Sequence, residues 1–200
     1  MDEGEWIRRI QQGEKQYLKP LIELHYAGIQ KYCYWRVRNE EESRDLTQET
    51  FYRFCRSIDK YTNKGKCRAY LYTIARNLCK DHLRKWKPSL SWEETDAAAD
   101  YGTLQQSSTI EDQVEREQLV HELLQLLPEE QRELVFMRFC LDLTFREIAH
   151  TTGVNVCMVQ YRVKSGLNLL RQHWERSESH EEEVRTGRHC GPKELPCAPH

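Results

Sequence analysis

Proline and glycine are scarce in this chain, with 6 and 9 copies in 200 residues. Residues 21–87 contain no proline at all, which permits long uninterrupted helices. No apolar run approaches the ~20 residues needed to span a bilayer, so membrane insertion is not expected. The shortage of turn residues disfavours a β-sandwich and predicts an all-α fold.

We do not expect a signal peptide either, because Met1–Glu5 is acidic where a signal sequence would be basic and then apolar. We therefore expect a cytoplasmic protein. In that compartment the eight cysteines are reduced thiols rather than a disulfide framework. The formal net charge is only −2, from 30 Lys and Arg against 32 Asp and Glu. This near-neutral total conceals a strong segregation of charge along the chain.

Charge divides the chain into segments. Residues 60–87 hold nine basic side chains and one acid, whereas residues 88–112 hold six acids and no Lys or Arg. The second segment is also rich in Ser, Thr, Ala and Gln, which is typical of a solvated linker. At ~3.3–3.6 Å per residue it could reach roughly 80–90 Å, so the flanking domains need not touch. We predict a domain at 1–87, an acidic linker at 88–112, a second domain at 113–174 and a flexible tail at 175–200.

The first domain shows helical periodicity in three places. Apolar residues recur on a helical period within residues 17–37, and Phe51, Phe54, Cys55 and Ile58 mark the buried stripe of a second helix. A third helix buries a stripe made of Leu71, Ile74, Ala75 and Leu78. Its opposite face presents Thr73, Asn77, Lys80 and Arg84.

That opposite face fits nucleic acid, because a row of Lys and Arg at helical spacing can neutralise successive phosphates. Tyr61, Tyr70 and Tyr72 lie beside the basic residues, and flat rings next to positive charge suit unstacked bases. A solvated basic face with its aromatics in the core explains the same pattern, and charge alone does not decide between the two.

The second domain has the signals of a helix-turn-helix. Residues 127–130 start a helix whose core we expect from Leu134, Val135, Phe136, Met137 and Phe139. Thr144 and Glu147 form a capping box, and Gly153 can end that helix in the left-handed conformation. Asn155 caps one more helix, with a buried line of Val159, Val163, Gly166 and Leu170. Gly166 costs about 1 kcal/mol relative to Ala inside a helix.

Taken together, residues Tyr17–Gln172 resemble the extracytoplasmic-function (ECF) sigma factors, of the sigma-70 family of bacterial RNA polymerase subunits. Residues 45–51 are similar to the helix that binds core polymerase, and Cys67–Arg84 to the minus-ten recognition helix. Leu126–Pro128 and Phe145–Ala149 are similar to parts of the minus-thirty-five recognition domain.

The resemblance implies the roles of particular residues. Core polymerase is implied to bind the chain through its β′ clamp helices and its β subunit. The residues implied to dock on the clamp helices are Asp45, Gln48, Glu49, Tyr52, Arg53 and Arg56. Tyr61, Asn77 and Asp81 are implied to hold a flipped base. Around them, minus-ten DNA contacts are implied for Lys64, Lys66, Arg68, Tyr70, Thr73, Arg76, Lys80 and Arg84. Major-groove contacts are implied for Asn155, Cys157, Met158, Gln160, Tyr161, Arg162, Lys164 and Ser165.

The sequence thus predicts a sigma factor that directs promoter-specific initiation, with promoter DNA, core RNA polymerase and an anti-sigma factor as partners. A free-standing helix-turn-helix regulator is the alternative, although it leaves residues 45–56 unexplained. No catalytic motif supports an enzyme, and no cofactor is expected. We expect no bound metal either; the tail residues that could form a site are His189, Cys190, Cys197 and His200.

Overall fold

The computed structural model describes residues 3–62, 66–86 and 118–186, with side chains described as far as residue 176 and not for Trp86. Within these ranges every regular element is a helix, so the all-α prediction is confirmed. The expected linker at 88–112, Lys64 and the tail residues His189, Cys190, Cys197 and His200 lie outside the described residues.

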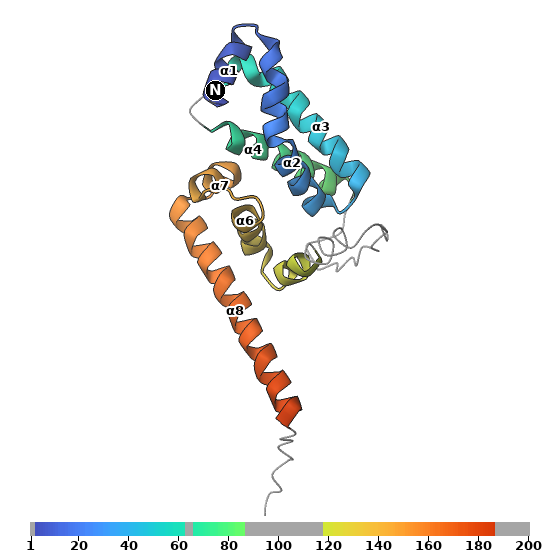
Figure 1. Ribbon diagram of the computed structural model, residues 1–200, viewed down its shortest axis with the longest axis vertical. Coiled ribbons are helices and arrows are strands. Elements are labelled where there is room, and N and C mark those ends of the chain that lie inside the picture. The colour runs from blue at the N-terminus through green and yellow to red at the C-terminus, as the bar shows by residue number, and fades with distance from the viewer. Residues whose placement is uncertain (1–2, 63–65, 87–117, 187–200) are drawn as a thin grey trace, which may run out of the picture.

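Three long helices form the centre of the N-terminal domain (Figure 1). They are α2 (Leu18–Val37), α3 (Glu40–Ser57) and α4 (Cys67–Trp86), and each packs on the other two. α1 (Glu3–Gln11) lies against the short 3-10 helices η1 (Lys15–Tyr17) and η2 (Ile58–Lys60). The centre of the bundle consists of fully buried side chains, among them Leu21, Ile29, Tyr32, Phe54 and Leu71.

Local sequence explains the turn between α2 and α3. Arg38 ends α2 in the left-handed conformation at φ 57°. The Asn39 side chain then caps α3 by accepting a hydrogen bond of 3.0 Å from the Glu42 backbone N–H. The acidic residues of 40–42 favour the positive end of the helix dipole. The second and third helices predicted for this domain therefore form as expected, although Cys55 and Ile74 are only partly buried.

The C-terminal domain consists of a helical stretch at 118–125 followed by α6 (Glu129–Phe139), α7 (Phe145–Thr152) and α8 (Val156–Thr186). Thr144 and Glu147 form the predicted capping box, and Gly153 ends α7 at φ 73°. The expected core is confirmed except for Phe139, which is 55% exposed, and Leu170, which is partly buried. Gly166 lets α8 approach α6, because a Cβ there would lie 3.1 Å from Val135 Cγ2.

α8 is longer than the sequence suggested, since it continues to Thr186, past the point where we expected a tail to begin (Figure 1). Residues 167–186 contain neither proline nor glycine, so nothing in them interrupts the helix. Among the described residues, none of the helices is both long and apolar enough to cross a bilayer.

The two domains are in contact, although the linker does not require it. α4 packs along α7 (Figure 1), and the Trp35 ring stacks on Phe136 with centroids 4.2 Å apart. The Thr151 hydroxyl donates a 3.2 Å hydrogen bond to the Ala69 carbonyl. The C-terminal domain therefore lies against the helix that the sequence assigned to DNA.

Candidate polymerase and promoter surfaces

The first candidate surface, which we call the α3 face, is a solvent-facing row on α3. Buried hydroxyls on the other side of the helix, such as those of Thr47 and Thr50, donate to backbone carbonyls at 2.7 Å and leave the polar row outside. Arg53 donates to Glu49 at 2.7 Å, and the Arg56 guanidinium lies 5.7 Å from the centre of the Tyr52 ring. The face consists of Asp45, Gln48, Glu49, Tyr52, Arg53 and Arg56. The sequence prediction for this group thus corresponds to one continuous, mixed-charge surface.

The second candidate surface, which we call the α4 face, is only partly open. It consists of Arg68, Thr73, Arg76, Asn77, Lys80, Asp81 and Arg84. Asn77, Lys80, Asp81 and Arg84 are exposed, and Arg84 pairs with Asp81 at 3.1 Å. The Thr73 side chain is partly exposed, and its hydroxyl already donates to the Ala69 carbonyl at 2.8 Å.

Two arginines of the α4 face are engaged by the C-terminal domain. Arg76 donates two hydrogen bonds of 3.0 Å to the Glu133 carboxylate, and both side chains are largely buried, at 17% and 12% exposure. Arg68 donates to the backbone carbonyls of Leu141 and Asp142. Both arginines were predicted to contact DNA, and in this arrangement their guanidinium groups bind protein instead.

Glu133 is the residue that sequence reasoning missed. Tyr32, which is fully buried, also donates to this carboxylate at 2.8 Å. Burial would raise the pKa of Glu133, but the Arg76 hydrogen bonds and the charges of Arg36 and Arg76 outweigh it, so this pKa is lowered from 4.5. Glu133 and Arg76 lie 57 positions apart in the sequence, and each is an ordinary residue for a helix. No local sequence motif therefore predicts that they form a pair.

The aromatic residues near α4 divide between core and surface. Tyr72 is buried at 3% exposure, so it belongs to the core. Tyr61 and Tyr70 are partly buried and stack on each other, with ring centroids 5.1 Å apart. Burial is the main cause that raises the pKa of Tyr61 to about 12. The expectation of open platforms for bases therefore does not hold for Tyr72, and Tyr61 and Tyr70 offer only part of their rings.

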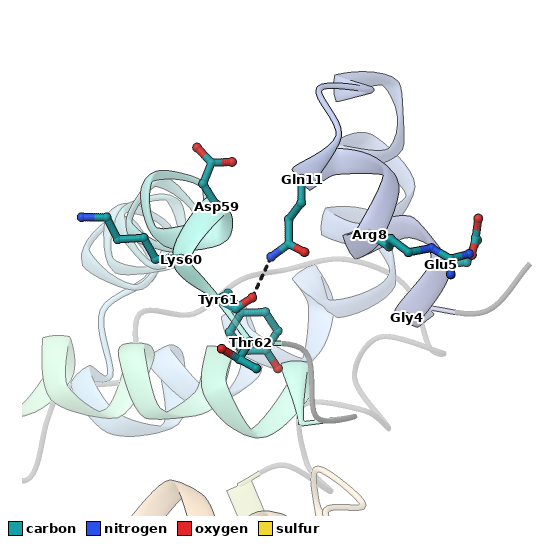
Figure 2. A pocket seen from close by; sticks show the side chains of 8 residues that line it. All are labelled: Gly4, Glu5, Arg8, Gln11, Asp59, Lys60, Tyr61 and Thr62. Carbon is teal, nitrogen blue, oxygen red and sulfur yellow. Dashed lines mark hydrogen bonds and ion pairs between the residues drawn. The ribbon is translucent and has the colours of Figure 1, made fainter.

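α1 holds the backbone beside Tyr61. Gln11 Nε2 donates to the carbonyls of Ile58 at 2.7 Å and of Tyr61 at 2.6 Å. Figure 2 shows the Gln11–Tyr61 contact beside a pocket of about 720 Å³, which α1 forms with η2, Tyr61 and Thr62. The exposed Lys66 lies just before α4.

The third candidate surface, the α8 face, is the start of α8. Asn155 caps this helix, accepting a 2.8 Å hydrogen bond from the Cys157 backbone N–H. Tyr161 is 68% exposed and Met158 is 45% exposed, whereas Arg162 pairs with Glu130 at 2.8 Å. The face consists of Asn155, Cys157, Met158, Gln160, Tyr161, Arg162, Lys164 and Ser165, of which Arg162 and Ser165 are partly buried. It is free of acidic residues and follows the tight turn at Gly153, as in a helix-turn-helix.

Comparison with known proteins identifies both domains. Residues 21–87 match the family described as Sigma-70 region 2, and residues 117–170 match Sigma-70, region 4. ECF RNA polymerase sigma factor SigW of Bacillus subtilis is 25% identical over 175 residues, covering 83% of this chain and 93% of that protein. ECF RNA polymerase sigma factor BldN of Streptomyces coelicolor is 31% identical over 172 residues, covering 83% of this chain and 64% of that protein.

Solved structures show the same fold. CnrH in complex with the cytosolic domain of CnrY has a TM-score of 0.65 at 17% identity, covering 87% of this chain and 97% of that one. The sigma factor RpoE from Bartonella quintana, in complex with the anti-sigma factor NepR, has a TM-score of 0.57 at 18% identity, covering 80% and 98%.

The chain therefore belongs to the sigma-70 family, among its ECF sigma factors. It is accordingly a sigma factor that binds core RNA polymerase and acts at promoter DNA in transcription initiation.

Proposed function

We propose that the three surfaces divide the work of initiation among themselves. The α3 face docks on the β′ clamp helices of core polymerase. The α4 face, with Tyr61, binds the melted minus-ten strand, where Tyr61, Asn77 and Asp81 hold a flipped base. The α8 face enters the major groove of the minus-thirty-five element. The isolated chain performs no catalysis and acts in the cytoplasm.

The observation that carries this proposal is that one chain exposes two such faces to solvent, the α3 face on its N-terminal domain and the α8 face on its C-terminal domain. The α3 face contains two arginines and an exposed tyrosine, which are residue types enriched at protein–protein interfaces, and its acids suit the polar rim of such an interface. The α8 face contains Lys and Arg and no acid, as phosphate contact requires. A free-standing helix-turn-helix regulator would have no use for the first of these surfaces.

The α3 face is tested by the double substitution Asp45→Ala and Glu49→Ala. We expect the variant to lose co-elution with core polymerase on size exclusion and to lose promoter-directed transcription. The matched control is Glu14→Ala with Glu23→Ala, two other solvent-accessible acids, one before η1 and one on α2, and it should behave as wild type. Transcription that survives the Asp45 and Glu49 substitutions contradicts the docking assignment.

The α8 face is tested by Lys164→Ala and Tyr161→Ala, two exposed positions that make no core contacts. Core polymerase carrying either variant should protect less of the upstream promoter element from nuclease, while still binding the chain. A chain that shifts duplex DNA equally well with and without polymerase would favour the free-standing regulator.

The α4 face can bind DNA fully only when the C-terminal domain moves away, because Glu133 and the carbonyls of residues 141 and 142 occupy Arg76 and Arg68. We therefore propose that the packed arrangement is the resting state of the free sigma factor. An anti-sigma factor is the proposed partner that retains the chain outside polymerase, because RpoE from Bartonella quintana, which has a similar fold, forms a complex with the anti-sigma factor NepR.

A further inference from the structure

Three metal-ligating side chains from three different helices meet at one end of the N-terminal domain. Glu3 is the first residue of α1, His25 lies in the middle of α2, and Cys67 is the first residue of α4. One ligand atom from each lies within 4.8 Å of the other two. His25 and Cys67 are buried, at 8% and 2% exposure.

The geometry already approaches that of a coordinated ion. Nitrogen and oxygen ligands at about 2.0–2.1 Å from a tetrahedral zinc ion lie about 3.3 Å from each other. In this structure His25 Nε2 lies 3.4 Å from Glu3 Oε1. The Cys67 sulfur completes a set with one sulfur, one nitrogen and one oxygen donor.

Unsatisfied polar atoms are a second, independent observation. His25 Nε2 is buried and its 3.4 Å contact with Glu3 does not have the geometry of a hydrogen bond, and the Tyr61 phenol oxygen is also buried without a hydrogen-bond partner. A buried polar atom without a hydrogen bond is costly, and a bound ion is one recognised explanation for it. Glu3 and Cys67 both act electrostatically on the Tyr61 phenol, so the Tyr61 oxygen lies close to the same cluster.

We infer that Glu3, His25 and Cys67 form a binding site for one borderline divalent cation of the zinc class, which ties α1 and α2 to the start of α4. A thiolate with an imidazole selects such ions over Mg²⁺ or Ca²⁺, which prefer oxygen ligands alone. Three protein ligands leave a fourth position for water. Glu3 lies outside the family match at 21–87, so this ligand set is a feature of this chain rather than of the matched region.

The site has a chemical consequence that can be measured. A zinc-class ion binds cysteine as the thiolate, whereas an ordinary thiol is protonated at neutral pH, so the ion must displace the Cys67 proton. Binding should release a proton and should strengthen as the pH rises.

The test is titration of the reduced full chain with Co²⁺, which substitutes for Zn²⁺ and gives a charge-transfer band when a thiolate binds it. We expect one Co²⁺ per chain, a thiolate band, displacement by Zn²⁺ and a melting temperature raised by several degrees. Cys67→Ser should abolish the band. Cys55→Ser, which removes a partly buried thiol from α3, should leave it unchanged.

Two further variants make the result decisive. Glu3→Gln removes a ligand whose side chain is 31% exposed, so the fold should persist while Co²⁺ binding weakens at least about tenfold. Cys190→Ser with Cys197→Ser removes the tail thiols and should keep the band. No thiolate band in the wild-type chain, or a band lost with the tail cysteines and retained in Cys67→Ser, overturns the site. Neither outcome depends on the proposed promoter contacts, because no polymerase or DNA is present.

Discussion

The interdomain ion pair provides the sharpest test of the resting state. The change is Glu133→Gln, which keeps the shape of the side chain and removes its charge. Arg76 would then retain its charge at 17% exposure with only one neutral acceptor in place of a bidentate carboxylate. Arg76 itself is left intact, so the variant does not remove a candidate DNA contact.

The size of the effect follows from burial. Removing one partner of a buried ion pair costs about 3–5 kcal/mol, because the other charge remains unpaired. In this protein the cost disappears when the domains separate, because Arg76 is then free to be hydrated. The substitution should therefore shift the equilibrium from packed to separated domains by roughly a hundredfold or more, at about 1.4 kcal/mol per factor of ten.

Two assays read this shift. The affinity for a fluorescent single-stranded oligonucleotide should increase by up to about a hundredfold. The reason is that the apparent affinity is reduced in proportion to the fraction of chains in the binding-competent, separated state. Small-angle scattering should show a larger radius of gyration. The matched control is Glu130→Gln, which breaks the Arg162 pair at a 71% exposed carboxylate within the C-terminal domain and should leave the scattering unchanged. An unchanged affinity together with a superposable scattering curve for Glu133→Gln would refute the reasoning.

Three other expectations are independent of that variant. The lowered pKa of Glu133 means that its pairing stabilises the packed state above pH 4.5 and is lost as the pH falls below that value, so scattering should be constant from pH 5.5 to neutrality and should expand only in acid. Gly28→Ala should destabilise the chain by about 1–3 kcal/mol in urea unfolding, because the new Cβ would lie 2.6 Å from the Tyr72 hydroxyl, and adding Tyr72→Phe should recover part of the loss. Thr144→Ala, which removes half of the capping box, should cost about 1 kcal/mol by the same measurement, and a loss below about 0.3 kcal/mol would contradict the capping role.

Much of the fold could be predicted from local pattern. The capping box at Thr144, the left-handed Gly153 and the cap at Asn155 are short-range signals, and each is present where the sequence indicates. The exposed α3 face also follows from helical period alone. Phe139 shows the limit of that approach, because apolar character does not say which side of a short helix finds a partner.

The contacts that decide access to the α4 face could not be predicted. The Arg76–Glu133 pair and the Trp35–Phe136 stack join residues from different domains across a linker long enough to allow any arrangement. The cluster of His25 with Glu3 and Cys67 could not be predicted from the sequence either, because a single histidine on an apolar helix face is an ordinary core residue. Such features depend on tertiary geometry, which periodicity does not carry.

The packed state supplies protein partners for two arginines of the α4 face. A surface that must bind phosphate needs free cations, yet a buried cation must be paired. The chain meets both needs by giving the arginines of the α4 face partners from the other domain, a carboxylate for Arg76 and carbonyls for Arg68. These polar contacts resemble those of a transient interface, which can open when a stronger ligand competes. Melted DNA, the ligand that we propose for the α4 face, offers many phosphates at once, whereas the protein offers Arg76 a single carboxylate. In the function that we propose, opening of the domains and promoter binding form one coupled equilibrium, to which the Arg76–Glu133 pair contributes.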